Sequence, residues 1–347
     1  MKTIQTLNGA VEVAKLGVIA PHEHILIDLT SQFTEPKTAA RKALAQQKVN
    51  IGNLDILRRD PYAIRDNLLL DSMETALYEL DFLKRTGAAT VIDLTLRGIG
   101  RDVRKLQKIA AQAGLNIVAG CGLYTHDTVP PREAAMSVEQ LAEHFVAELT
   151  AGIEDSPLKA GVIGEIGTSD YIRPVEERAL RAAAIASVIT GVPIYVHLYP
   201  WGKEGLKVLD ILGEHGVAPW DICICHVDVA FDDDYIVALL QRGAYVEFDN
   251  FGKEFYILKE PGGFAGGAFA RDVERVHVIK RLIAAGYEDQ ILLANDVCLK
   301  ELLHSYGGWG YDHVIGNIVP MMIAEGIDKD AAAKLVTANP NNFLAGR

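Results

Sequence analysis

The chain has 347 residues, of which 49% are hydrophobic and 23% charged, a composition typical of folded globular proteins and not of disordered ones. Its net charge of −12, with no long basic run, argues against a nucleic-acid partner, because phosphate binding requires clustered Lys and Arg. No segment is long and apolar enough to span a membrane, and the first residues lack the apolar core of a signal peptide, so we expect a cytoplasmic protein.

Eight short apolar runs have the character of buried strands. They lie at residues 17–20, 89–94, 117–120, 161–166, 193–198, 222–226, 244–248 and 290–294. Most are rich in Val, Ile or Leu with little alternation, as expected for strands that are covered on both faces. We interpret Cys223 and Cys225, inside the sixth run, as small buried side chains and not as metal ligands.

Helical patterns alternate with these runs and stop near a glycine, which is a common helix terminator. The clearest lie at residues 177–190, 204–215, 233–242 and 273–285, and a periodic tail at 328–336 is typical of a closing helix. This alternation predicts a (β/α)8 TIM barrel, forming a single domain over residues 1–347. A doubly wound open sheet is disfavoured because no glycine-rich nucleotide fingerprint follows the first strand.

Two segments are longer than ordinary loops. They cover residues 31–66 and 251–271, and each follows the end of a predicted strand. Barrel active sites are built from such connections. The second segment contains a glycine-rich stretch, and it is either a mobile cover over the site or a plain surface excursion.

Side chains of metal-ligand type stand at the ends of five predicted strands. They are His22, His24, Glu165, His197, His226 and Asp296. His22 and His24 face the same side of an extended segment because side chains alternate with a period of two. One histidine near a strand end is more often structural than a ligand, but six coincident positions at one barrel mouth favour a metal centre.

The number of ligands predicts two metal ions. One ion cannot use four imidazoles and two carboxylates and still leave a position for water, whereas two ions can if Glu165 bridges them. This donor set suits Zn2+, with Mn2+, Co2+ or Fe2+ as alternatives. A pair of ions about 3.5–4 Å apart would hold a bridging hydroxide and polarise a substrate oxygen, and Asp296 would accept the proton.

Further local sequences carry a family resemblance. They are residues 21–24 with Asp28, 161–169, 245–249 with 251–253, 295–298 with Lys300 and 306–311, and 339–340 with Phe343. Together with the ligand pattern, they resemble the phosphotriesterase family of the amidohydrolase superfamily over essentially the whole chain. The phosphotriesterases proper carry a carboxylated lysine at strand four, where this chain has Glu165, as in the phosphotriesterase homology proteins.

The resemblance implies a hydrolase with His22, His24 and Asp296 on the buried metal and His197 and His226 on the exposed one. It favours a small carboxylic ester or lactone as substrate, with or without an anionic group, and suggests a homodimer. Phosphotriester or phosphodiester hydrolysis, an amidase or deaminase, and a non-catalytic binding barrel remain as alternatives.

Eight more residues are candidates by position. Asp228 would form a proton relay behind the site, or else cap the helix that begins near residue 233. Lys253 and Lys300, and less clearly Arg271, would meet an anionic group, or else lie on the surface. The four aromatic candidates would line one wall of the substrate site, or else pack within the loops. They are Tyr124, Tyr199, Trp201 and Tyr256.

Overall fold

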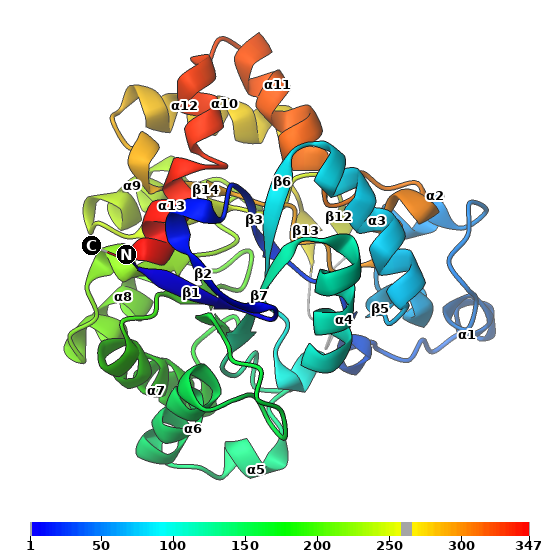
Figure 1. Cartoon of the computed structure of the whole chain (residues 1–347). Helices are drawn as coiled ribbons and strands as arrows, with labels where there is room; N and C mark the ends of the chain where they lie inside the picture. Colours follow the sequence, from blue (N-terminus) through cyan, green and yellow to red (C-terminus); the bar gives the residue numbers. More distant parts are fainter. Residues whose placement is uncertain (1, 258–265, 347) are drawn as a thin grey trace.

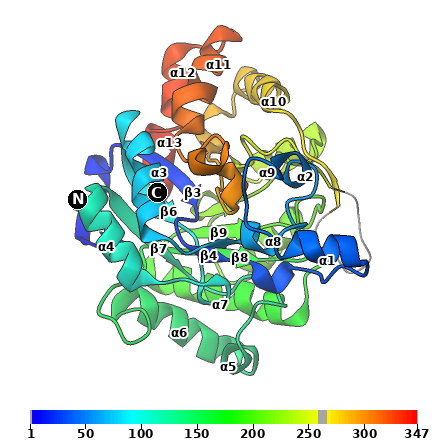
Figure 2. The ribbon, with the colours of Figure 1, turned by 90° about the vertical axis from the view of Figure 1, so that its right-hand side faces the viewer.

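Eight parallel strands form one sheet that curves into a barrel (Figures 1 and 2). The computed structural model describes residues 2–257 and 266–346. In sheet order the strands are β3 (Val18–Glu23), β6 (Ala88–Asp93), β7 (Asn116–Cys121), β8 (Val162–Gly167), β9 (Ile194–His197), β10 (Ile222–Ile224), β11 (Tyr245–Phe248) and β14 (Ile291–Leu293). The backbone N–H of Asp296 donates to the carbonyl of His22 at 3.2 Å, which joins the end of the last strand to the first. The predicted (β/α)8 barrel is confirmed.

All eight predicted strands are present, with two notable differences in their ends. The first extends through Glu23, so His22 lies within β3 and His24 directly follows it. The sixth ends at Ile224, so His226 stands on the connection that follows β10. Hydrogen bonding sets these ends, whereas hydrophobicity alone does not report where a parallel ladder stops.

Helices cover the outside of the barrel (Figure 2). The longer ones are α3 (Met73–Arg85), α4 (Val103–Ala113), α6 (Val138–Thr150), α7 (Pro174–Thr190), α8 (Gly205–Glu214), α9 (Asp233–Gln241) and α10 (Asp272–Ala284). The four predicted helices correspond to α7 to α10, and Gly191 ends α7 in the left-handed region at φ +69°. In the part of the chain that the structure describes, none of the helices is apolar over a length sufficient to cross a membrane.

The barrel interior is filled by inward-facing side chains of the strands. Cys223 and Cys225 belong to this interior cluster as buried free thiols. Phe343, on α13 (Ala338–Ala345), packs against Tyr195 and Tyr245 with ring centroids 5.0 Å away. The helix that contacts β3 and β14 is therefore α13, whereas the predicted closing segment at 328–336 forms α12 (Lys329–Lys334), which packs on α11 (Val319–Ala324). A π-helical turn, Val314–Ile318, precedes α11, and the unpredicted hairpin β1 (Thr3–Thr6) and β2 (Gly9–Glu12) begins the chain.

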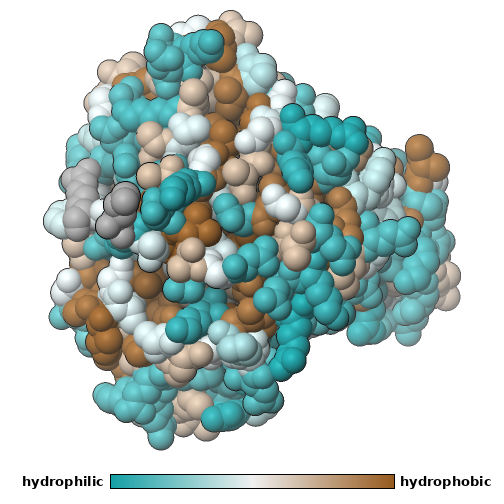
Figure 3. Space-filling view, in the orientation of Figure 1, coloured by the Kyte–Doolittle hydropathy of each residue, from teal (hydrophilic) through white to brown (hydrophobic). Residues whose placement is uncertain are grey.

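The long segment at 31–66 is a folded insertion and not an irregular loop. It contains α1 (Ala39–Ala45) and α2 (Leu54–Leu57), and it is flanked by β4 (Ile27–Asp28) paired with β5 (Leu69–Leu70). A small apolar cluster of Val49, Leu54, Leu57 and Ile64 holds it together. The insertion projects from the barrel, and its exposed face is mostly hydrophilic (Figure 3).

The described parts of the second long segment include an antiparallel strand pair beside the cavity. Its strands are β12 (Tyr256–Ile257) and β13 (Gly267–Ala268), and the indole of Trp201 donates to the carbonyl of Ala268 at 3.4 Å. The prediction of a mobile cover falls largely on residues 258–265, which lie outside the described residues. A four-residue helix, α5 (Pro131–Ala134), follows β7 on another side of the barrel mouth.

The insertion is attached to the connection after β14 through Glu301. The carboxylate of Glu301 accepts a hydrogen bond from the side-chain nitrogen of Asn67 at 3.1 Å, and burial raises the pKa of Glu301 to about 8. The folded protein therefore binds this proton more tightly than the unfolded chain does. The free energy of unfolding should consequently fall as the pH rises from the ordinary pKa of a glutamate toward 8.

We expect Glu301→Gln to raise the thermal midpoint relative to the parent protein at pH 9 and to change it little at pH 5, because the amide cannot ionise in its buried position. Thermal unfolding followed by circular dichroism at both pH values checks this. Exposed Glu143→Gln is the matched control and should have no such pH-dependent effect. An equal shift at both pH values would contradict the ionisation of Glu301.

Candidate metal centre

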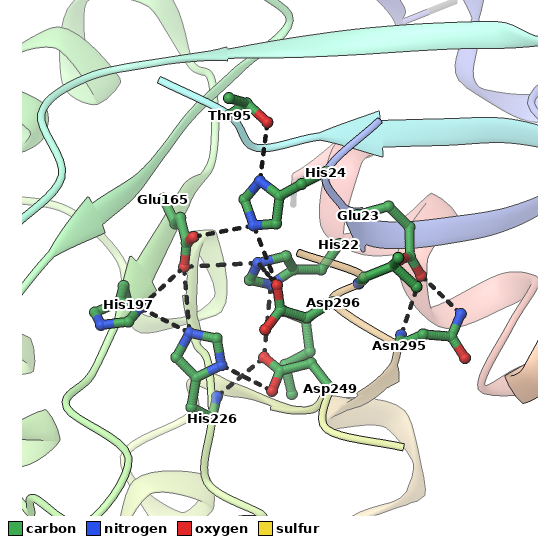
Figure 4. A network of polar contacts seen from close by, with 12 residues as sticks. His22, Glu23, His24, Thr95, Glu165, His197, His226, Asp249, Asn295 and Asp296 are labelled. Carbon is green, nitrogen blue, oxygen red and sulfur yellow. Dashed lines mark hydrogen bonds and ion pairs between the residues drawn. The ribbon is translucent and has the colours of Figure 1, made fainter. Parts of the chain in front are cut away.

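Glu165, within β8, lies at the centre of a cluster of four histidines (Figure 4). Its Oε2 atom is 3.3 Å from both His197 Nδ1 and His226 Nε2, and 3.6 Å from His22 Nε2. Its Oε1 atom is 3.4 Å from His24 Nε2. The two oxygens of one carboxylate thus face imidazoles that come from opposite sides of the barrel mouth.

Asp296 completes one side of this cluster. Its Oδ1 atom is 3.1 Å from His24 Nε2 and 3.8 Å from His22 Nε2. The ligand atoms of His22, His24 and Asp296 lie within 4.8 Å of one another, and so do those of His22, Glu165 and His226. The structure therefore brings together all six residues that the sequence predicts as ligands.

The pKa shifts within the cluster indicate that it stabilises positive charge. Burial alone would lower the pKa of His24, but its contacts with Asp296 and Glu165 raise it to about 9. Burial acts in the same way on His226, and Asp249 and Glu165 raise its pKa to about 10. The pKa of Glu165 is held well below its usual range by the surrounding imidazoles, despite its burial. These anionic and imidazole donors suit divalent cations, which would replace the protons.

The environment of the His22 ring also fits a bound metal ion. The Nε2 atom of His22 is buried and has no hydrogen-bond partner among the described residues, although it faces both Glu165 and Asp296. A buried polar atom without a partner is unfavourable unless something else satisfies it. Its other ring nitrogen is already engaged, so Nε2 is the atom that remains available for a ligand bond.

Three of the four histidines are oriented by a partner on the ring nitrogen that faces away from Glu165. His22 Nδ1 is 2.8 Å from Glu247, His226 Nδ1 is 2.9 Å from Asp249, and His24 Nδ1 is 2.9 Å from the hydroxyl of Thr95. Such partners fix the ring orientation of metal-binding histidines. The sequence prediction assigned no role to Glu247 and Asp249. Their spacing of two along the seventh strand, the same as that of His22 and His24, is the signal that would have indicated it.

Two of the predicted ligands stand on strained backbone. Among the described residues, His226 at φ +60° and Asp296 at φ +46° are two of three non-glycine positions in the left-handed region. Such positions persist only where the surroundings enforce them. Here the N–H of His226 donates to Asp249, and Glu23 accepts from the N–H groups of Asn295 and Val297 on both sides of Asp296.

Asp228 is buried and lies in a hydrogen-bond network with Asn250, which also contacts Asp249. It accepts hydrogen bonds from the backbone and side chain of Asn250, and it forms an ion pair with Arg275 at 2.8 Å. It does not cap α9, because Asp232 accepts from the N–H of Tyr235 there. Its predicted relay to Asp296 has no direct contact in the described residues; the connection runs through Asn250 and Lys253.

Of the three basic residues predicted to meet the substrate, Lys253 is the one that lines the cavity. It is 3% exposed, forms an ion pair with Asp296, and its ammonium lies 3.3 Å from the side-chain oxygen of Asn250. Burial would raise the pKa of Asp296, but this ammonium and the neighbouring histidines hold it below its usual range.

A cavity of about 630 Å3, part of it open to solvent, lies over the cluster. Tyr124 and Trp201 line it, as predicted for an aromatic wall, and the hydroxyl of Tyr124 is 3.1 Å from His197 Nδ1. The other lining residues are Ile27, Leu29, Gln32, Pro61, Tyr62, Pro200, Asn250, Lys253, Phe255, Ile257, Phe269, Cys298 and Leu299, besides five of the six cluster residues.

The structure does not bring four of the predicted substrate contacts into this lining. Lys300 forms an ion pair with Asp66 at 2.8 Å, and Arg271 is exposed and pairs with Glu274. Tyr256 is 62% exposed, and Tyr199 lies behind Trp201 with ring centroids 5.6 Å apart. Position after a strand end does not determine the direction in which a loop side chain points.

The model of the phosphotriesterase family matches residues 2–344. The chain belongs to the phosphotriesterase family. This match and the hydrolases among its relatives make it a metal-dependent hydrolase that acts on a small molecule.

Proteins with several different names are similar to this chain over almost its whole length. The N-acetyltaurine hydrolase of Rattus norvegicus is 33% identical over 98% of this chain and 97% of its own length. The crystal structure of a resiniferatoxin-binding protein from Rhodobacter sphaeroides is 35% identical, with a TM-score of 0.95 over 99% of this chain and 94% of that one. The phosphotriesterase homology protein from Escherichia coli, with phosphate in its active site, is 28% identical, with a TM-score of 0.77 over 95% and 99% of the two chains.

We expect Glu247→Gln to weaken metal binding by roughly 10–100-fold, because the amide no longer supplies a negative charge that orients His22. Competition with a chelator, followed by elemental analysis, measures this. Exposed Asp210→Asn serves as the control and should bind metal as the parent protein does. Unchanged affinity in the Glu247 variant would show that His22 is oriented without it.

Proposed function

We propose that this family member is a dinuclear metal hydrolase that cleaves a small carboxylic acyl compound. His22, His24 and Asp296 would hold one ion, and His197 and His226 the other, with Glu165 bridging the two. The observation that carries the proposal is the position of Glu165, whose two oxygens lie between these two sets of ligand atoms. The donor set favours Zn2+, with Mn2+, Co2+ or Fe2+ as alternatives.

Two divalent ions bound there would lower the pKa of a water molecule so that it attacks the substrate, and would polarise the scissile carbonyl. The carboxylate of Asp296, at the edge of the cluster, is placed to accept the proton of the attacking water. Lys253 holds Asp296 in its ionised form, so that the carboxylate carries no proton before the water attacks. The onward relay to Asp228 stays a prediction, and its path would run through Lys253 and Asn250.

The cavity favours a small substrate with an apolar part and an anionic group. Its walls are largely aliphatic and aromatic, and Lys253 is the basic side chain in the described lining. The family resemblance favours an ester or lactone, whereas the relatives named N-acetyltaurine hydrolase favour an amide with a sulfonate. The same residues would support cleavage of an ester bond and of an amide bond, so the proposal covers both. N-acetyltaurine is the first compound to test.

Two alternatives have specific support. The phosphate in the active site of the Escherichia coli relative favours a phosphoester. The relative named as a resiniferatoxin-binding protein favours a binding barrel, but the intact ligand set of this chain argues for catalysis. The cytoplasmic location and the homodimer remain predictions. Gel filtration with light scattering tests the homodimer.

We expect protein purified without chelator to contain about two equivalents of a transition metal, and Glu165→Ala to contain one or none, because the bridge is lost. Elemental analysis of both proteins measures this, with exposed Glu143→Ala as a control that retains the metal. One equivalent in the parent protein would contradict a dinuclear centre.

In a substrate panel, we expect an acyl compound with a carboxylate or sulfonate to have a kcat/KM about tenfold or more above that of its neutral analogue, because a charged hydrogen bond forms only with the anion. The panel would contain N-acetyltaurine, N-ethylacetamide, lactones with and without a carboxylate, and a neutral phosphotriester. Fastest turnover of the phosphotriester would instead favour the phosphoester alternative.

A further inference from the structure

Gln32 is a buried polar side chain in the cavity wall that lacks a partner. It is 7% exposed, it lines the cavity, and its side-chain nitrogen makes no hydrogen bond to any described residue. Its backbone is fixed at the end of a 3-10 turn, Thr30–Gln32, where its N–H donates to the carbonyl of Leu29 at 2.9 Å. The side chain of Asp28 accepts a hydrogen bond from the N–H of Thr30, the first residue of this turn, at 2.9 Å. The turn thus fixes the backbone of Gln32, whereas its side-chain nitrogen has no hydrogen-bond partner among the described residues.

Other polar side chains of the wall, outside the ligand cluster, are already engaged. The amide of Asn250 donates to Asp228 and Asp249, the ammonium of Lys253 contacts Asp296, and the hydroxyl of Tyr124 contacts His197. Within the described residues, Gln32 therefore differs from these neighbours in having an amide donor to spare for a ligand.

The surroundings of Gln32 indicate the chemistry of that ligand. The same segment contributes Ile27 and Leu29 to the wall, so the amide stands among apolar side chains. A buried donor without an acceptor is unfavourable, and an oxygen on a bound ligand would remove this penalty. Among the described residues, no hydrogen bond joins the side-chain nitrogen of Gln32 to the six cluster residues, so this donor is available to a bound substrate.

We propose that Gln32 is a specificity-determining residue whose amide donates to an oxyacid group, a carboxylate or sulfonate, of the substrate. This proposal rests on the proposed function and names the group that the cavity selects. An oxyacid has two or three acceptor oxygens, so it can satisfy Gln32 and also approach the ammonium of Lys253. A site built to form such a bond discriminates against an analogue that lacks the acceptor.

The test uses Gln32→Leu, which keeps similar volume and removes the donor, and exposed Gln112→Leu as the matched control. Both are compared with the parent protein after loading with Zn2+. The probes are N-acetyltaurine and N-ethylacetamide, which differ in the sulfonate. We expect the ratio of their kcat/KM values to fall about tenfold or more in Gln32→Leu, through a higher KM for N-acetyltaurine, and to stay unchanged in Gln112→Leu.

Stability separates a binding role from a structural one. Because leucine replaces an unsatisfied buried amide, the thermal midpoint of Gln32→Leu should equal or exceed that of the parent protein, with the same metal content. A lower midpoint, or an equal loss of activity on both probes, would overturn the proposal.

Failure of the proposed function gives a different result. If the parent protein does not hydrolyse N-acetyltaurine, calorimetric titration with the same compound still measures its Kd. A Kd that rises about tenfold in Gln32→Leu would support the role of Gln32 without catalysis, since a lost hydrogen bond has that size. An equal Kd, or no binding to the parent protein, would overturn it.

Discussion

A buried carboxylate surrounded by four imidazoles is the interaction on which this site depends. Glu165 contributes one negative charge at a point where His22, His24, His197 and His226 converge. Burying a charge is costly unless oppositely charged or hydrogen-bonding partners surround it. The barrel provides these partners by directing strand ends from both halves of the chain to one mouth. The arrangement of the other polar residues follows from the need to keep this centre compact.

A second layer of carboxylates makes the arrangement rigid. Glu247 and Asp249 orient two of the histidines, and Glu23 holds the backbone on both sides of Asp296. Burial raises the pKa of Glu23 to about 7 and that of Glu247 also to about 7. So many acids close together would repel one another in an empty site. The cations that we propose for this site would explain why the interior retains them.

The sequence predicted the barrel and the ligand set because both depend on short, regular spacing. Strands with apolar runs and side chains at their ends can be recognised from periodicity, and His22, His24 and Asp296 were found in this way. The orientation of loop side chains has no such period. Lys253 enters the cavity while Lys300 pairs with Asp66, although both follow a strand end. Gln32 was missed because an isolated glutamine after a strand carries no pattern, and its significance depends on the absence of a partner in three dimensions.

The hydrogen bond between Asp296 and His22 has a consequence for how the protein is made. It joins His22 in β3, the first strand of the barrel, to Asp296, which follows β14, the last strand. These two strands contact each other although most of the chain separates them. A nascent polypeptide on the ribosome carries the histidine pair early, yet lacks the aspartate until synthesis is nearly finished. The ligand set of the proposed centre is therefore complete only after synthesis of the C-terminal segment, and fragments without Asp296 would lack one of its members.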